Sequence, residues 1–248
     1  MAPRVRIGTS GWNYPHWQKV FFPADLARTK WLDYLGKVFD TVEVNATFYR
    51  SMRPSTFAKW YRETPQGFVW AVKANRFITH IRRLEEVSEP LQNFLASLAP
   101  LKEKLGPVLF QLPPSLSFSP KVASSFFALL PSGRFALEAR NESWLSEEAL
   151  CLLKEYQIAW CISDTAGRFP YREAVTTDFI YIRLHGSQRL YTSSYTDEEL
   201  SAWARKILAW NLDTYVYFDN DFAGYAPINA LRLKELLKLT NEAKDGSK

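Results

Sequence analysis

Hydrophobic residues along this chain gather in eight short runs rich in Val, Ile, Phe, Tyr and Trp, the residue types favoured in β-strands. The runs cover residues 5–9, 41–45, 68–73, 108–112, 135–138, 158–163, 179–184 and 215–219. Most of the segments between them place apolar residues three and four positions apart, the period of a helix with one buried face. These predicted helices are residues 29–38, 55–62, 84–105, 119–130, 146–156, 196–210 and 227–239.

Strands that alternate with helices pair in parallel through right-handed crossovers, and eight of them close a TIM-like (β/α)8 barrel. The chain has 248 residues, so we assign residues 1–240 to one α/β barrel domain and expect a disordered tail over 241–248. Residues 165–177 carry Gly167 and Pro170 without helical periodicity, which predicts a helix-poor connection between strands six and seven. The alternative is an open doubly wound sheet, whose Gly-rich turn Gly8-Thr-Ser-Gly11 matches weakly.

Strand seven indicates which side chains face the barrel interior. Between residues 180 and 185, isoleucine and leucine alternate with Tyr181, Arg183 and His185. Residues two apart share one face of a strand, and the apolar set suits the surrounding helices. The polar set is therefore expected inside, near the C-terminal mouth, and the same reasoning places Glu43 and Asn45 there.

A TIM-like barrel carries its active site at the C-terminal ends of its strands, where nearly every predicted strand of this chain supplies a polar group. Candidates for catalysis are Glu43, Glu138, Asp164 and His185. Candidates for ligand binding are Ser10, Trp12, Asn45, Lys73, His80, Gln111, Arg140, Arg183 and Asn220. We expect one cavity to hold Glu43, Lys73, Gln111, Glu138, Asp164, Arg183 and His185. Structural ion pairs are the alternative explanation for the charged members.

Composition narrows the class of protein without choosing a substrate. The net charge is +5 and aromatic residues make up 15% of the chain, which permits nucleic acid as a partner beside a small-molecule ligand. No apolar stretch approaches the roughly 20 residues of a membrane span, and no signal peptide is recognisable. Cys151 and Cys161 are too few for a disulfide scaffold or a zinc cluster. We expect a soluble cytoplasmic protein, with cofactor, metal and oligomeric state left open.

Several segments, taken in order, resemble the YecE-like family, a domain of unknown function (number 72). They are Gly8-Thr-Ser-Gly-Trp12, Val42-Glu-Val-Asn45 with Thr47-Phe-Tyr49, Lys73 with Thr79-His80, Leu109-Phe-Gln-Leu-Pro-Pro114, Glu138-Ala-Arg140, Tyr181-Ile-Arg-Leu-His-Gly186 and Asn220-Asp221. The similarity runs from about residue 4 to 238. It implies a TIM-like barrel and no particular reaction.

This chain departs from that family's pattern at two positions. Asn141 stands where the pattern has His, which weakens a mechanism with two histidines at that place. Asp219 stands where the pattern has the first of two Asn, and an added carboxylate raises neighbouring pKa values by like-charge repulsion.

Three functions remain open on the sequence alone. The first is an enzyme for a small anionic or sugar-like molecule, with Glu43 or Glu138 as general base, His185 as acid and Arg140 or Arg183 holding an anionic group. The second is a barrel that binds or processes nucleic acid, in one version with metal held by Glu43, Glu138, Asp164 and His185. The third is a ligand-binding protein without catalysis.

Overall fold

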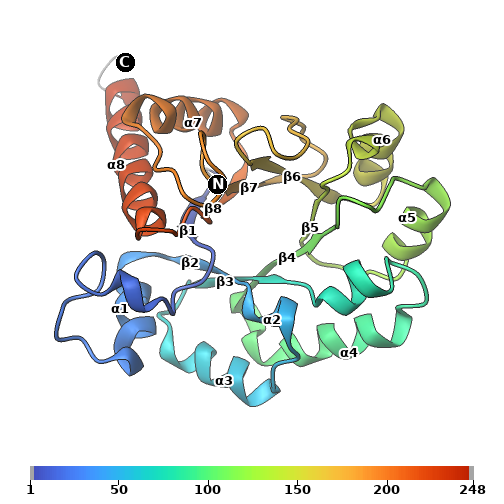
Figure 1. Ribbon diagram of the computed structural model, residues 1–248, viewed down its shortest axis with the longest axis horizontal. Coiled ribbons are helices and arrows are strands. Elements are labelled where there is room, and N and C mark those ends of the chain that lie inside the picture. The colour runs from blue at the N-terminus through green and yellow to red at the C-terminus, as the bar shows by residue number, and fades with distance from the viewer. Residues whose placement is uncertain (1–2, 246–248) are drawn as a thin grey trace.

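A computed structural model describes residues 3–245 and shows eight parallel strands surrounded by helices (Figure 1). The strands are β1 (Val5–Thr9), β2 (Thr41–Val44), β3 (Val69–Lys73), β4 (Leu105–Gln111), β5 (Phe135–Glu138), β6 (Ile158–Asp164), β7 (Phe179–Leu184) and β8 (Asp213–Phe218). They pair in the order β1-β8-β7-β6-β5-β4-β3-β2, and every ladder is parallel. The predicted TIM-like barrel is confirmed, with one irregular seam.

The outer helices follow the strands in turn, and a short helix, α2, sits at the end of β2. The helices are α1 (Trp31–Val38), α2 (Ala46–Tyr49), α3 (Pro54–Glu63), α4 (Ser88–Leu98), α5 (Pro120–Phe127), α6 (Glu147–Glu155), α7 (Asp197–Trp210) and α8 (Tyr225–Asp245). Between β6 and β7 the described chain forms no helix, as the sequence predicts. Helix α8 continues through 241–245, the start of the segment expected to be a disordered tail, while 246–248 lie outside the described residues.

One long predicted helix, over residues 84–105, is wrong in its extent. Helix α4 covers only Ser88–Leu98, and a 3-10 segment follows over Ala99–Lys104. Lys102 there has φ 49°, a left-handed backbone that ends the helical path. The chain then enters β4 at Leu105, three residues earlier than the hydrophobic pattern alone indicates.

Helix starts follow the local sequence closely. The Thr196 side chain accepts from the Glu199 backbone N–H while the Glu199 carboxylate accepts from the Thr196 N–H, which completes the predicted capping box of α7. Ser119 and Ser146 cap α5 and α6 through the serine hydroxyl alone, which accepts from the Val122 and Ala149 backbone N–H groups.

The seam between β1 and β2 is held by a single parallel bridge between Ser10 and Glu43 instead of a full ladder. The Gly11 N–H donates to the Glu43 carbonyl at 2.8 Å. Below that point a Cβ on Gly8 would lie 2.2 Å from the Thr41 carbonyl oxygen, so only glycine admits this close approach. The barrel is nearly closed, because β1 and β2, the two end strands of the sheet, meet at this seam.

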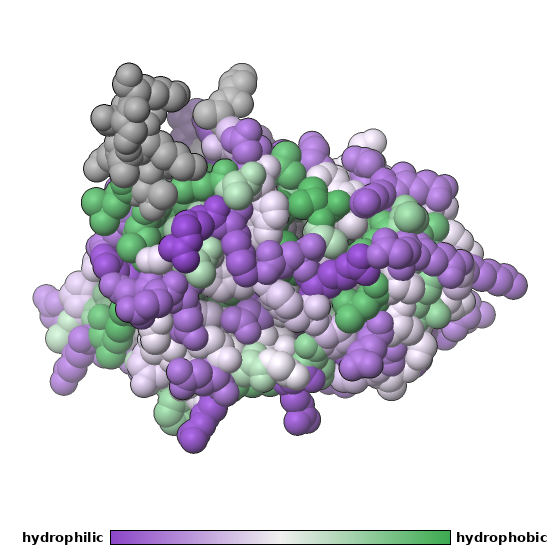
Figure 2. All heavy atoms as spheres, turned by 90° about the horizontal axis from the view of Figure 1, so that it is seen from above, coloured by the Kyte–Doolittle hydropathy of each residue, from purple (hydrophilic) through white to green (hydrophobic). Residues whose placement is uncertain are grey.

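Two hydrophobic layers position the site. Strand side chains that face outward pack with the helices, while a second cluster fills the barrel interior with Val69, Ala71, Leu109, Ala136, Ala159, Cys161, Phe179, Tyr181, Tyr215 and Tyr217. In each of several strands, the residue two positions after the last interior hydrophobic residue also faces inward and lies at the C-terminal mouth of the barrel. On the outer face in Figure 2, hydrophilic side chains dominate and hydrophobic ones appear in small separate groups. None of the described helices has the length and apolar character that crossing a membrane requires.

Candidate functional site

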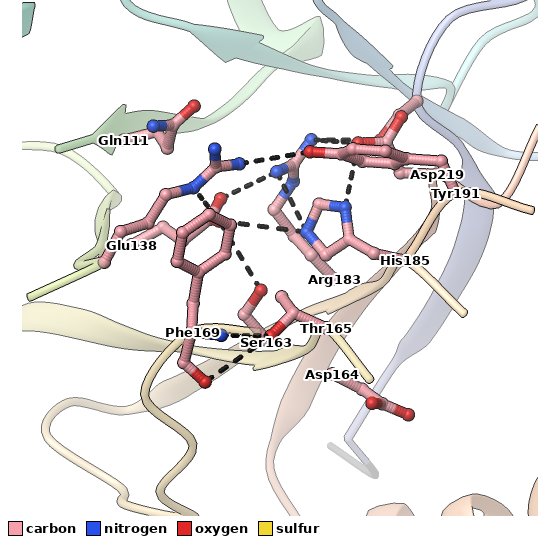
Figure 3. A network of polar contacts seen from close by, with 12 residues as sticks. Gln111, Glu138, Ser163, Asp164, Thr165, Phe169, Arg183, His185, Tyr191 and Asp219 are labelled. Atoms are coloured by element: carbon pink, nitrogen blue, oxygen red, sulfur yellow. Dashed lines mark hydrogen bonds and ion pairs between the residues drawn. The ribbon is translucent and has the colours of Figure 1, made fainter. Parts of the chain in front are cut away.

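Arg183 of β7 lies at the centre of a buried ion network above the interior layer. Its side chain is 1% exposed, and its guanidinium meets three carboxylates. Nη2 lies 2.8 Å from Glu43 Oε1 and 3.0 Å from Asp219 Oδ2, while Nη1 lies 2.7 Å from Glu138 Oε2. Opposite charges on Glu43, Glu138 and Asp219 raise the pKa of Arg183 further, against the opposing effect of burial. Figure 3 shows Arg183 between Glu138 and Asp219. The sequence offered structural ion pairs as an alternative but did not indicate that one guanidinium serves all three carboxylates.

Glu43 has every accepting position occupied. Besides Arg183, the Ser10 hydroxyl donates to its Oε1 at 2.7 Å and the Tyr181 hydroxyl donates to its Oε2 at 2.6 Å. The Arg183 Nε donates to the same carboxylate at 3.0 Å. A carboxylate so saturated is a fixed counter-ion, which speaks against the predicted role of Glu43 as general base.

Glu138 is likewise held as an anion. Burial by itself would raise its pKa, but the nearby Arg183, Arg140, His185 and Lys73 outweigh burial and bring the pKa well below the usual range. Arg140 Nε lies 3.3 Å from Glu138 Oε1. Glu138 is therefore ionised at neutral pH and does not act as a proton donor there.

His185 and Asp219 form the side of the network nearest the mouth. His185 Nδ1 lies 3.0 Å from Asp219 Oδ2, and its Nε2 lies 3.2 Å from Arg183 Nη1. Burial raises the pKa of Asp219, but Arg183 and His185 lower it more, and the net direction is downward. The expected repulsion from Asp219 appears at Asp221 instead, where burial first, and Asp219 among lesser causes, raise the pKa to about 6.

A pocket of about 530 Å³ opens above this network. Five of the predicted ligand-binding residues line it: Asn45, Lys73, His80, Gln111 and Arg140. The remaining lining residues are Tyr14, Phe48, Tyr49, Arg76, Tyr191 and Asp219. Glu43, Glu138, Arg183 and His185 are buried in the ion network and are not part of the pocket's lining.

Lys73 ends β3 and carries a buried amine without a hydrogen-bond acceptor among the described residues. Its Nζ lies 4.4 Å from the centre of the Phe48 ring and makes no hydrogen bond or ion pair with another described residue. Burial, and then the Arg183 cation, lower the pKa of Lys73 to about 8, with Glu138 among the groups opposing that shift. A minor but much enlarged fraction of this amine is therefore neutral near pH 7.

His80 lies in a π-helical turn, Phe77–Ile81, a distortion that often marks functional positions. Burial first, and then the cations Lys73 and Arg140 among others, lower the pKa of His80 to about 4. Its Nδ1 lies 2.8 Å from the Thr79 hydroxyl. The ring is neutral at pH 7 and can exchange a proton with a ligand through its other nitrogen.

Two predicted residues point away from the pocket for one physical reason. In β6, Ala159 and Cys161 face the interior, so the two-residue period puts Ser163 inside and Asp164 outside. Asp164 accepts from the Tyr195 hydroxyl at 3.0 Å and lines a separate hollow, set apart from the network in Figure 3. The expectation that it shares the cavity is wrong.

The same period in β8 directs Asp219 inward and Asn220 outward. Asn220 donates to the Ser193 carbonyl and to Asn229, so it fixes the β7–α7 loop and does not line the pocket. Tyr215 and Tyr217 both face the interior, and Asp219 follows two residues later on the same face. This two-residue spacing is the sequence signal that could have selected Asp219.

Ser10 and Trp12 also lie outside the pocket lining. Ser10 is buried under Glu43, and Trp12 packs edge-on against Trp60 and Trp70 with ring centres 5.2 and 5.4 Å away.

At the departure from the family pattern, Asn141 donates to the Pro114 carbonyl at 2.7 Å and accepts from the Ser143 N–H. Its role in this chain is to brace a loop.

Two lining residues, Tyr191 and Arg76, were not predicted from the sequence. Tyr191 comes from the loop before α7 and receives a long hydrogen bond of 3.4 Å from Arg140 Nη2. Arg76 follows β3 by three residues in a turn that no periodicity describes. Among the side chains that the structure describes, no three His, Cys, Asp or Glu residues group as metal ligands do. The proposed ligand set fails locally because Arg183 occupies the space between Glu43 and Glu138.

The fold and this geometry define a TIM-like barrel protein with a buried Arg–carboxylate network beneath a cation-lined pocket at the C-terminal mouth. Residues 6–248 match the family described as "Protein of unknown function DUF72". The chain belongs to the DUF72 family.

Relatives agree with that membership. UPF0759 protein YunF of Bacillus subtilis (strain 168) is 27% identical over 95% of both chains. UPF0759 protein YecE of Escherichia coli (strain K12) is 25% identical over 58% of this chain and 51% of its own length. A crystal structure of a DUF72 family protein from Thermotoga maritima MSB8 has a TM-score of 0.85 and 32% identity, over 94% of this chain and 99% of that one.

Proposed function

We propose that the pocket at the C-terminal mouth binds a small anionic molecule and that the protein acts on it as an enzyme. The observation that carries the proposal is a pair of cations without protein partners. The Lys73 Nζ and the Arg76 guanidinium both face the pocket, and neither forms a hydrogen bond or ion pair with another residue of the described chain. Arg140 adds a third cation. Lys73 is buried, and a buried ammonium is usually paired unless a ligand pairs with it. Arg76 is exposed at the pocket, where its guanidinium is available to an anion.

The volume and the remaining walls indicate the size and character of the ligand. About 530 Å³ suits a small organic molecule. Gln111 and Asn45 offer amides for hydroxyl or carbonyl groups, and Phe48 and Tyr191 offer apolar ring surfaces. A carboxylate or phosphate on a short polar skeleton matches these walls best.

Proton transfer falls to Lys73 and His80 in this proposal, in place of the buried carboxylates. Glu43 and Glu138 are engaged by Arg183, whereas Lys73 and His80 reach the pocket with pKa values lowered to about 8 and about 4. The partly neutral Lys73 amine is the better base near pH 7, while the neutral His80 imidazole is a weaker base that can pass a proton on.

Calorimetry with inorganic phosphate and with a small carboxylate such as malonate tests the anion site. The Arg76→Gln variant is expected to weaken binding by about 1–2 kcal/mol, since a charge-assisted hydrogen bond is lost. The matched control is Arg62→Gln, which changes an exposed arginine of α3 outside the pocket. Absence of anion binding in the wild type, or an equal effect of both variants, would contradict the proposal.

Nucleic acid is the second candidate, because an aromatic ring stands exposed beside the cations. Tyr49 is 72% exposed at the pocket edge, near Arg76. Exposed rings next to arginines stack on bases while the arginines contact phosphates. Single-stranded oligonucleotides that bind more tightly with each added nucleotide, and lose affinity in Tyr49→Ala, would favour this function over a small anion.

A further inference from the structure

We propose that Lys73 forms a covalent imine with a carbonyl carbon of the ligand, so that the substrate class is small anionic aldehydes and ketones such as 2-oxo acids or phosphorylated carbonyl compounds. The inference rests on the proposed anion site and adds the reacting group to it.

The comparison of two buried lysines carries the argument. Lys104 is 6% exposed, and its Nζ donates to the Tyr61 carbonyl at 2.7 Å and to the Thr64 carbonyl at 2.6 Å. Lys73 is 8% exposed, yet its Nζ has no oxygen acceptor among the described residues. The chain thus satisfies one buried ammonium fully and leaves the other facing a pocket. An amine so placed is positioned for a ligand atom.

The surroundings of Lys73 favour its nucleophilic form. The Phe48 ring covers one side at 4.4 Å, and burial with the Arg183 cation brings the pKa to about 8. At pH 7 about a tenth of such an amine is neutral, roughly 300 times the fraction for an ordinary lysine. Desolvation and a neighbouring cation are the two recognised ways of activating a lysine nucleophile.

The chemistry balances without an external oxidant or reductant. The neutral Nζ attacks the carbonyl carbon, a C–N bond forms and the π electron pair moves to oxygen. One proton passes from nitrogen to that oxygen, a second proton arrives, and the oxygen leaves as water to give the iminium. Starting from the ammonium, no net proton is taken up. The neutral His80 ring in the same pocket can relay these protons.

The ligand's anionic group and its carbonyl would be held at different places. Arg76 and Arg140 reach the pocket from the loops after β3 and β5, while Lys73 ends β3. A charged group on the two arginines leaves a carbonyl of the same molecule free to meet Nζ. This division of roles favours a carbonyl compound that carries a carboxylate or phosphate over a neutral aldehyde.

Reductive trapping tests the proposal on the whole protein. Glyoxylate, a small anionic aldehyde, is added at pH 7 with sodium cyanoborohydride, and peptide mapping locates the carboxymethyl group left on lysine. Lys73 is expected to carry at least about tenfold more label than exposed Lys37 or buried, satisfied Lys104, in line with its larger neutral fraction. Inorganic phosphate should compete with this labelling.

Two outcomes separate this inference from the anion site. In Lys73→Arg the cation remains, so phosphate binding should persist while labelling at position 73 is lost. If the wild type binds phosphate but labels Lys73 no more than Lys37, the imine is overturned and the anion site stands. If the wild type binds no anion, the proposed function fails. Should Lys73→Arg not fold, the wild-type label distribution alone decides.

Discussion

Arg183 and Glu43 come from non-adjacent strands, β7 and β2, and meet in the barrel with Nη2–Oε1 2.8 Å and Nε–Oε2 3.0 Å. Both side chains are almost completely buried. This two-pronged contact ties the two sides of the irregular seam together above the interior layer, since β1 and β2 share only one bridge there.

Replacing Arg183 with Met should lower the free energy of unfolding by about 3–5 kcal/mol, because Glu43 and Glu138 lose their buried counter-ion. Urea unfolding followed by circular dichroism measures the change. The control Arg62→Met, on an exposed position, should stay within about 0.5 kcal/mol. A variant Arg183→Met as stable as the wild type would show that the network does not hold the barrel.

Acid stability should depend on Glu138. Its folded pKa is lowered, so below about pH 4.5 the unfolded chain binds a proton that the folded protein does not. The stability contributed by this group is present above that pH and is lost as the pH falls toward the folded pKa. Glu138→Gln should be about 3–5 kcal/mol less stable at pH 7, and its gap to the wild type should narrow in acid. A gap that is constant from pH 7 to acid would contradict the assignment.

Anion binding should change the titration of His80. Burial and surrounding cations hold its pKa at about 4, and a bound phosphate would offset those cations. The pKa is expected to rise when phosphate is added, as read from the ring nitrogen shifts by NMR. In Arg76→Gln, where phosphate binds more weakly, the rise at the same phosphate concentration should be smaller. An unchanged His80 titration at saturating phosphate would remove this ring from the anion site.

The seam should tolerate no side chain at Gly8. In Gly8→Ala, the new Cβ meets the Thr41 carbonyl oxygen at 2.2 Å and the strands must move apart, which should cost about 1–3 kcal/mol. Gly133→Ala is the matched control, since its Cβ would meet only the Phe135 ring at 3.3 Å. The midpoint of thermal unfolding should be lower for Gly8→Ala than for Gly133→Ala. Equal midpoints would show that the close approach is not required.

The eight strands, the helix-free connection between β6 and β7 and the cap at Thr196 could all be predicted from the sequence, because they depend on local periodicity and on side chains a few residues apart. The two-residue period of a strand also placed Glu43, Asn45 and Arg183 on inward faces. Lys73, Gln111 and Glu138 were placed at the mouth because they lie at or near the ends of their strands. Applied to Tyr217 and Cys161, the same period would have chosen Asp219 over Asn220 and Ser163 over Asp164.

Which of these inward groups pair with one another could not be predicted from the sequence, because it depends on how the strands are arranged in space. Arg183 reaches Glu43 and Glu138 because strand tilt and register bring three strands to one level, a relation that no single strand encodes. Among the described residues the Lys73 amine has no acceptor for the same reason, because Glu43 and Glu138 are already paired with Arg183. The three-dimensional arrangement of the strands determines which buried charges pair. In this barrel Arg183 pairs with the carboxylates, and Lys73 faces the pocket.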